Sequence, residues 1–407
     1  MALVGVSVHR VDAHMWATWC PVMTSAGPSV VWICGAPGAG KSMAARALVE
    51  LLTGDGQRVA YVDIDQLGML YPAADDDPQR HRFKAEALRK LLPGHAMAGA
   101  QIVVVSGVID PARGPSSPLT SDVDLTLCLL TPDPAGLRER ILARGCGPDA
   151  ADEAAAEDAL LREAPFVDIA IETSDLTIAA TAERLRALDR PVGPSTTPPR
   201  RMASSPGTTG VVVITGPRAS GTSTVAFGLA TDRWRAGLRT GFVDLQQIGF
   251  IAGGTDTHLA EPALAIRQLA AMHSLMAARG AELLVVSGHL DPRTHDALRD
   301  ALPSAPVDVV RLRADKATIE AHVRGRARGS EARLAGDDLL EASSAHQADV
   351  VATALSQQEL LDAAAAEDLV LDVGGRSPAD VVSDVERFLC QVETVNGSGP
   401  RATRRYC

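Results

Sequence analysis

The stretch Gly35-Ala-Pro-Gly-Ala-Gly-Lys-Ser42 decides the fold of this chain. The apolar run VVWIC (30–34) precedes it, and the helical run MAARALVELL (43–52) follows it. The eight residues match the pattern GxxxxGK[ST], whose glycines let backbone N–H groups wrap around phosphates where a Cβ would obstruct them. A strand, a glycine-rich loop and a helix in this order predict a phosphate-binding loop (P-loop) that opens an α/β domain.

The side chains of this loop have separate expected roles. Lys41 is expected to reach the β- and γ-phosphates of a nucleotide, and Ser42 to offer its hydroxyl to Mg²⁺. The start of the following helix adds the positive end of its dipole. The alternative is a glycine-rich turn that happens to carry Lys-Ser. The predicted nucleotide contacts are Gly35, Ala36, Pro37, Gly38, Ala39, Gly40, Lys41, Ser42 and Met43.

The loop is echoed later in the chain, because VVWICGAPGAGKS (30–42) resembles VVVITGPRASGTS (211–223) at an offset of 181 residues. The same offset relates two further pairs of segments. A fourth echo, 168–177 against 368–377, has a larger offset, which indicates insertions in the second copy. The pairs are VDIDQLG (62–68) with VDLQQIG (243–249), and VVVSGVIDP (103–111) with LVVSGHLDP (284–292). The sequence therefore predicts a tandem repeat of one domain.

Domain boundaries follow from the repeat and from composition. We expect a first half at 29–189 and a second half at 210–392. The segment 190–209, rich in Pro, Ser and Thr, is predicted to be a flexible linker. Residues 1–28 and 393–407 show no periodicity and are expected to be a loose N-terminal extension and a disordered tail.

The first half alternates short apolar runs with helical patterns, which predicts strands that are buried on both faces of a parallel sheet. The helical patterns span Ser42–Leu52 and His81–Leu92. The predicted strands are Val30–Cys34, Val59–Val62, Ile102–Val105, Leu125–Leu130 and Phe166–Ile171. We therefore expect two tandem α/β/α domains of three layers, each with a mainly parallel five-stranded sheet.

Composition excludes several classes of function. The net charge of −11 disfavours a nucleic-acid partner, because binding to phosphates requires a positive field. No apolar run is long enough to span a membrane, and no membrane partner is expected. The six cysteines lack CxxC and zinc-site spacings, so they are interpreted as reduced thiols in a cytoplasmic protein.

Two carboxylates follow the second predicted strand, at the edge where parallel sheets present side chains to ligands. Asp65 is the preferred base for an attacking hydroxyl, and Asp63 is expected to help hold Mg²⁺ together with Ser42. A solvated strand-end carboxylate or a helix cap is the alternative for each. The second half has Gln246 in place of Asp65 but keeps Asp63 as Asp244.

Basic residues further along suggest a lid. Arg140 and Arg144 lie four residues apart on one predicted helical face, where they could close over a phosphoryl group and offset its charge. A solvated basic face is the alternative. Arg82 and Lys84 offer a weaker possibility of binding an anionic acceptor.

Taken together, the P-loop, VDxD, the strand ending in Ser106-Gly107, the Arg-bearing segment and DIAIETS (168–174) resemble the P-loop kinases of small molecules and nucleoside monophosphates. Adenylylsulfate kinases, chloramphenicol phosphotransferases and zeta-toxin-like kinases belong to this group. The resemblance covers about residues 29–188 and implies ATP and Mg²⁺ as cofactors and a small-molecule acceptor. It also places Thr173 and Ser174 near the adenine base.

The second half has Thr222 where the first has Lys41, which removes the main charge that acts on the phosphates. We therefore predict an ATP-dependent phosphotransferase that acts on a small hydroxyl-bearing molecule, with its chemistry in the first half and a pseudo-kinase in the second. The two halves are expected to pack against each other. The alternative is an ATP-binding and ATP-hydrolysing regulatory switch. It is favoured by Ser106-Gly107, which stands where P-loop enzymes often carry an acid, and by the lack of a recognisable acceptor pocket.

Overall fold

The computed structural model describes residues 27–115, 119, 123–188, 209–253, 262–329, 339–340, 342–364 and 366–395. Nearly all of the predicted N-terminal extension and linker, and the tail from residue 396, lie outside these residues. The predicted domain boundaries therefore stay predictions.

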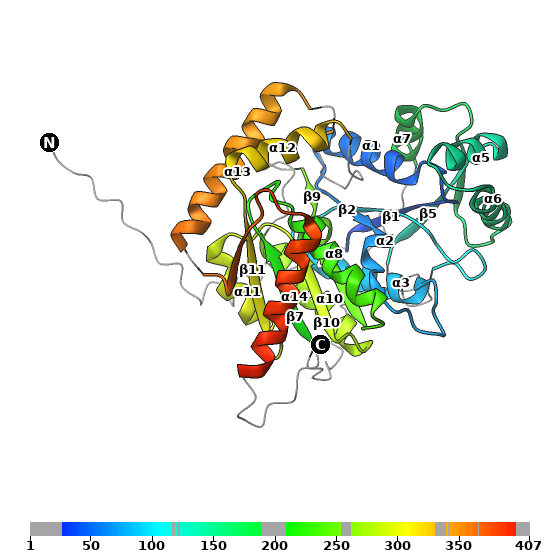
Figure 1. Cartoon of the computed structure of the whole chain (residues 1–407). Coiled ribbons are helices and arrows are strands. Elements are labelled where there is room, and N and C mark those ends of the chain that lie inside the picture. Colours follow the sequence, from blue (N-terminus) through cyan, green and yellow to red (C-terminus); the bar gives the residue numbers. More distant parts are fainter. Residues whose placement is uncertain are drawn as a thin grey trace.

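The first half forms a sheet in which five parallel strands lie in the order β6-β5-β1-β4-β2. These strands are apolar and buried because helices cover both faces of the sheet (Figure 1). The strands are β1 (Ser29–Cys34), β2 (Val59–Asp63), β4 (Ile102–Ser106), β5 (Leu125–Thr131) and β6 (Ile169–Glu172). The helices are α1 (Lys41–Gly54), α2 (Ile64–Leu67), α3 (His81–Met97), α5 (Pro134–Ala143), α6 (Pro148–Arg162) and α7 (Ile178–Arg186).

The second half repeats this arrangement, with the order β12-β11-β7-β10-β8. Its strands are β7 (Gly210–Thr215), β8 (Thr240–Asp244), β10 (Leu283–Ser287), β11 (Val307–Arg313) and β12 (Leu369–Asp372). Its helical segments are α8 (Thr222–Arg235), α9 (Leu245–Ile248), α10 (Pro262–Ala278), the 3₁₀ turn η2 (Pro292–Thr294), α11 (His295–Ala301), α12 (Lys316–Ala327), α13 (Ser344–Ala364) and α14 (Pro378–Val395). The predicted α/β class is confirmed in both halves.

Each sheet also has a sixth, antiparallel strand that comes from the other half. Strand β3 (Leu70–Tyr71) pairs with β8, and β9 (Ile251–Ala252) pairs with β2. The exchange is reciprocal, because Tyr71 lies opposite Thr240 while Ala252 lies opposite Val59, at the same offset of 181 residues. Such an isologous contact is typical of a two-fold interface between like subunits. Here it lies within one chain.

The two halves also share a hydrophobic core. One cluster of buried residues contains Leu88 and Leu91 of α3 together with Leu269 and Met272 of α10. Helices α3 and α10 pack against each other, and the buried Gln268 donates a hydrogen bond to the Leu91 carbonyl at 2.9 Å. The exchanged strands and this shared core join the two sheets into one body (Figure 1).

Three details differ from the sequence-based expectations. Helix α3 does not stop before Pro93 but continues to Met97, where Gly94 and His95 are buried. Strand β6 begins at Ile169 rather than Phe166. Cys34, Cys128 and Cys146 are free thiols as predicted, whereas Cys390 is disulfide-bonded, because spacing along the chain does not reveal which cysteines meet in space.

Candidate active site

The phosphate-binding loop lies between β1 and α1, in the position that the sequence predicts. Gly38 has φ +86°, and a Cβ at this position would lie 3.0 Å from Ile141 Cδ1. The loop and lid therefore touch here, and a side chain at residue 38 would push α5 away. One buried cluster unites Ala36 of the loop with Leu137 and Ile141 of α5 and with Ala151 and Ala154 of α6. We call α5 and α6 the first lid.

Lys41 begins α1 and turns back over the loop. Its ammonium group donates hydrogen bonds to the carbonyls of Gly35, at 2.8 Å, and Ala36, at 2.9 Å. Burial lowers its pKa below the ordinary value for lysine, and the nearby carboxylates Asp65 and Glu157 oppose this shift. The charge of Lys41 is thus held at the loop, with carboxylates around it.

Asp63 ends β2, and its side chain accepts a hydrogen bond from the Asp65 N–H at 3.0 Å, which caps α2. Burial raises its pKa, and the charge of Asp65 adds to this effect. Tyr61, on the same strand, is hydrogen-bonded to Ser106 at 2.8 Å and also to Ser42. The P-loop serine and Asp63 therefore lie around one polar corner at the ends of β2 and β4.

Asp65 faces α3. Its Oδ1 lies 2.7 Å from Nζ of Lys84, whose side chain is only 6% exposed, whereas that of Asp65 is 45% exposed. Gly107 follows β4 with φ +132°, and a Cβ there would lie 3.1 Å from Asp65 Oδ2. His81 is close to this pair, and burial followed by the charge of Lys84 lowers its pKa. Of the basic residues suggested for the acceptor, Lys84 reaches Asp65, whereas Arg82 is exposed and pairs with Asp76.

Sequence reasoning missed Glu157. This half-buried residue of α6 interacts electrostatically with Lys41, Asp65 and Lys84. Burial raises its pKa, and the charge of Lys41 lowers it. Its place in an alanine-rich helix gave no motif to recognise, but extending the fourth sequence echo backward would have aligned it with Gln357 of the second half.

The lid arginines are exposed. Arg140 donates a hydrogen bond to the Gly136 carbonyl of its own helix at 3.1 Å, and Arg144 caps the end of α5. At the position that matches Arg140, α12 of the second half carries His322, whose Nδ1 lies 2.7 Å from the loop carbonyl of Ala219. A side chain at this helix position can therefore reach a P-loop. The role of Arg140 and Arg144 stays a prediction.

Thr173 and Ser174 follow β6. The Thr173 N–H donates to the Thr131 carbonyl at 3.1 Å, while Ser174 donates to the Glu172 carboxylate. The Thr173 hydroxyl is buried and has no hydrogen-bond partner among the described residues. A buried hydroxyl without a partner costs free energy, so a ligand atom beside it would be favourable.

The second P-loop is held by its own surroundings. Ser223 donates to Asp244 at 3.0 Å, and Ser287 donates to the same carboxylate oxygen at 2.7 Å. Gln357 of α13 accepts a hydrogen bond from the Arg218 N–H at 2.9 Å. His289, interpreted from sequence as a loop residue, bonds through Nδ1 to the Gly216 carbonyl at 3.0 Å.

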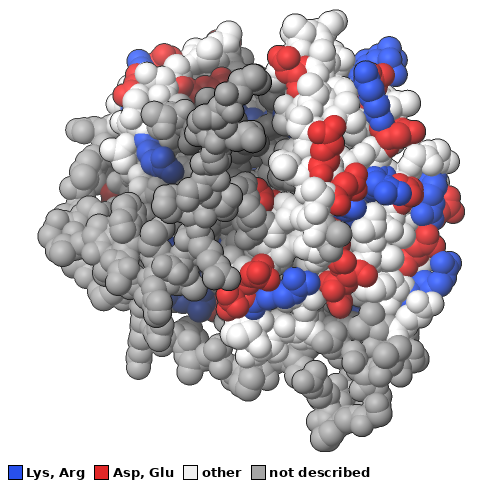
Figure 2. Space-filling view, turned by 90° about the vertical axis from the view of Figure 1, so that its left-hand side faces the viewer, with Lys and Arg blue, Asp and Glu red and all other residues white. Residues whose placement is uncertain are grey.

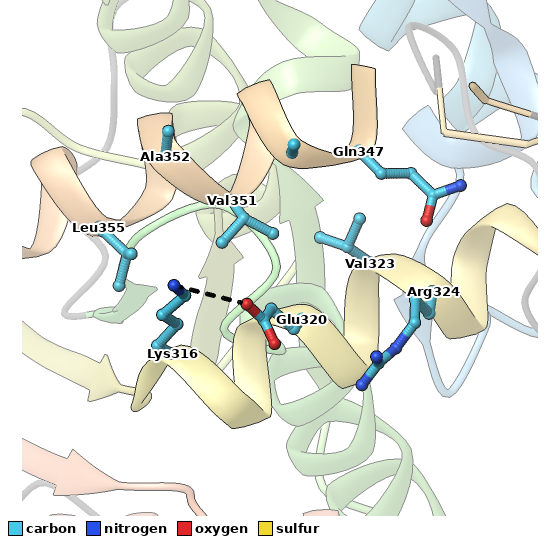
Figure 3. A pocket seen from close by; sticks show the side chains of 9 residues that line it. Lys316, Glu320, Val323, Arg324, Gln347, Val351, Ala352 and Leu355 are labelled. Carbon is cyan, nitrogen blue, oxygen red and sulfur yellow. Dashed lines mark ion pairs between the residues drawn. The ribbon is translucent and has the colours of Figure 1, made fainter. Parts of the chain in front are cut away.

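A cavity whose lining includes no P-loop residue lies between α12 and α13 (Figure 3). Its volume is about 280 Å³, and Lys316 and Glu320 face each other across 3.8 Å at its rim. In the first lid the matching groove is bridged by an ion pair between Arg138 and Asp152. The cavity lacks the lysine and carboxylates of the P-loop site, so we do not assign the chemistry to it.

Figure 2 shows acidic and basic side chains interspersed over one face of the molecule, and the described residues visible there form no continuous basic stripe. None of the described helices is long and apolar enough to cross a membrane. The described residues also contain no cluster of three or more His, Cys, Asp or Glu side chains suited to a metal ion.

Comparison with solved structures finds several kinases that the chain resembles. The chain resembles a gluconokinase from Sinorhizobium meliloti (18% identity, 46% of this chain and 94% of that chain, TM-score 0.31). It also resembles the APS kinase of Mycobacterium tuberculosis, solved with AMPPNP and APS (19% identity, 45% of this chain and 98% of that chain, TM-score 0.30). A third similar structure is the shikimate kinase of Bacteroides thetaiotaomicron (13% identity, 44% of this chain and 98% of that chain, TM-score 0.31).

The chain is similar to P-loop kinases. Each of these kinases matches less than half of the chain. A family model described as Nephrocystin 3, N-terminal, matches residues 12–89. No curated protein matches the chain. At these identities and TM-scores, the likeness to P-loop kinases assigns no substrate.

Proposed function

We propose that the chain is an ATP-dependent phosphotransferase that acts on a small hydroxyl-bearing molecule in its first half. The observation that carries this proposal is the position of Asp65, whose carboxylate is partly exposed, paired with Lys84 and close to Lys41. A site that only hydrolysed or sensed nucleotide would not need a carboxylate held beside the P-loop lysine on the acceptor side.

The residues fit the reaction as follows. The acceptor hydroxyl oxygen forms a bond to the γ-phosphorus of ATP, the bond from that phosphorus to the β–γ bridging oxygen breaks, and ADP leaves with the electron pair. Asp65 takes the hydroxyl proton, while Lys41 offsets the charge on the phosphates. Ser42 and Asp63 would hold Mg²⁺, which supplies charge neutralisation when it is bound. The buried hydroxyl of Thr173 would meet the nucleotide base.

We also propose that the second half is a pseudo-kinase. It lacks the P-loop lysine and the base, and its loop is bonded to Gln357, His289 and His322. The regulatory switch stays the alternative, because Ser106, which is hydrogen-bonded to Tyr61, stands where P-loop enzymes often carry an acid.

The test measures consumption of Mg-ATP by the purified full-length chain with a panel of alcohols, sugars, amino sugars and nucleosides. We expect one acceptor class to stimulate turnover, and Lys41→Ala to abolish that stimulation. Slow hydrolysis that no acceptor changes would overturn the kinase proposal and favour the switch.

A further inference from the structure

Glu157 lies on the helix of the first lid that packs against the P-loop. Ala151 and Ala154 on the same helix pack in one cluster with Ala36 of the P-loop. Glu157 follows Ala154 by three residues and therefore lies on the same helical face. It interacts electrostatically with Lys41, Asp65 and Lys84. The lid thus brings a third carboxylate to the side of the P-loop where the acceptor must sit.

Comparison of the two halves marks Glu157 as part of this site. The matching hydrogen bonds of Asp168 to the Leu127 N–H and of Asp368 to the Val309 N–H, both 2.8 Å, fix the correspondence of this region at an offset of 200 residues. Five positions lose their titratable side chain together in the second half: Lys41 to Thr222, Asp65 to Gln246, His81 to Pro262, Lys84 to Ala265 and Glu157 to Gln357.

Three neighbouring positions keep their residues, which argues against a general drift of the second half. They are Ser42 with Ser223, Asp63 with Asp244, and Ser106 with Ser287. The retained residues bond to one another in the second half and support its local structure. The lost residues are those that surround the acceptor space. The position of Glu157 therefore changed together with the positions of the reacting groups, whereas the scaffold positions stayed the same.

Two carboxylates lie near the acceptor space, and one of them is already paired. Asp65 and Glu157 interact electrostatically with each other, and Asp110 interacts with His81. Lys84 is already paired with Asp65. Lys41 belongs to the phosphates once a nucleotide binds. An acceptor with a carboxylate or phosphate would thus meet the like charge of Glu157, whereas a cation would be attracted to it.

On the basis of the phosphotransferase function proposed above, we propose that Glu157 selects a hydroxyl-bearing acceptor that carries a protonated amino group. The ammonium group pairs with Glu157 while the hydroxyl group lies at Asp65. Closure of the first lid over the P-loop brings Glu157 to the acceptor, so recognition of the acceptor and enclosure of the phosphates are one event.

The test uses matched acceptors that differ only in charge, such as glucosamine, glucose and glucuronate, together with equivalent sets on cyclitol and short-chain alcohol scaffolds. Acceptor-stimulated ATP turnover is measured for the full-length protein, for Glu157→Gln and for Glu153→Gln. Glu153 lies on the same helix, but its side chain is exposed, so it controls for the loss of one lid charge.

We expect kcat/KM for the amine of the best scaffold to exceed that for the carboxylate at least ~10-fold, and Glu157→Gln to remove most of this preference. Glu153→Gln should keep it. A carboxylate acceptor that reacts as well as its amine, or a preference unchanged in Glu157→Gln, would overturn the inference.

A binding measurement separates this inference from the kinase proposal. Calorimetry of the same compounds with the ATP-saturated protein should show preference for amines even if phosphoryl transfer fails. In that case the phosphotransferase function falls and charge selection by Glu157 stands. Equal binding of amines and carboxylates, or no binding of either, would overturn charge selection by itself.

Discussion

Nζ of Lys84 lies 2.7 Å from Oδ1 of Asp65, and this ion pair links the proposed base to a helix that the second half supports. Lys84 is on α3, which packs against α10 of the second half. Arg279 of the second half also pairs with Glu86 of α3 at 2.5 Å. A half without its own P-loop lysine can therefore contribute to the reaction by fixing the helix that orients Asp65.

Replacement of Lys41 by alanine should lower acceptor-stimulated turnover by at least ~100-fold, because the charge that stabilises the transferring phosphoryl group is lost. Thr222→Ala, at the matching position of the second P-loop, should change turnover by less than about two-fold. Steady-state assays of both variants check this. Equal losses would show that both loops take part in the chemistry.

Asp65→Asn should slow transfer by about 100-fold or more, while the affinity for Mg-ATP changes little, because a general base acts on the acceptor and not on the nucleotide. Asp133→Asn, which alters an exposed helix cap on the first lid, serves as the control. Nucleotide titration beside single-turnover assays separates the two effects. Weakened nucleotide binding at unchanged transfer rate would move Asp65 to the metal site.

The sequence was sufficient to predict the sheets but not the way they join. Apolar runs such as Ile102–Ser106 and the matching P-loops carry strong local signals. Strands β3 and β9 are two residues long and show no periodicity, and each pairs with a segment about 170 residues away or more. The extension of α3 beyond Pro93 also depends on packing against Gln268, which no local pattern reveals.

The residues of the site also divide into those that a local sequence signal reveals and those that only tertiary packing brings together. Lys41, Asp63 and Asp65 stand at strand ends or in a motif, where position along the chain determines position in space. Lys84 and Glu157 reach the site from helices, and only tertiary packing brings them to Lys41 and Asp65. The internal repeat holds a usable signal for both, because the second half has Ala265 and Gln357 at these positions.

The junction of the two halves should limit the stability of the whole chain. A Cβ at Gly94 would lie 2.7 Å from Oε1 of Gln268, which is 1% exposed and held by its bond to Leu91. Overpacking costs about 1–3 kcal/mol, which outweighs a helix-propensity gain of at most about 1 kcal/mol. Gly94→Ala should lower Tm by about 2–4 °C in a thermal melt.

Gly54→Ala is the matched control, because Gly54 also lies in a helix but a Cβ there would have no neighbouring atom within 4 Å among the described residues. It should leave Tm unchanged or raise it slightly. A Gly94→Ala protein that melts at or above the wild-type temperature would contradict the tight contact between α3 and α10.

Stability should also fall in mild acid because of His95. This residue of α3 is fully buried, neither ring nitrogen has a hydrogen-bond partner among the described residues, and burial lowers its pKa to about 4. The unfolded chain binds a proton near pH 6.5 and the folded chain does not, so the stabilisation is complete above pH 6.5. It is lost progressively as pH falls toward 4, by about 3 kcal/mol in total.

Urea unfolding between pH 7.5 and 4.5 tests this contribution by comparing the wild type with His95→Leu, which cannot take up the proton. We expect the free energy of unfolding to fall more steeply with decreasing pH in the wild type. His322→Gln removes an exposed histidine and should keep the wild-type slope. If His95→Leu and the wild type lose stability in parallel, the protonation that destabilises the fold lies at other groups, and α3 tolerates a charged imidazole.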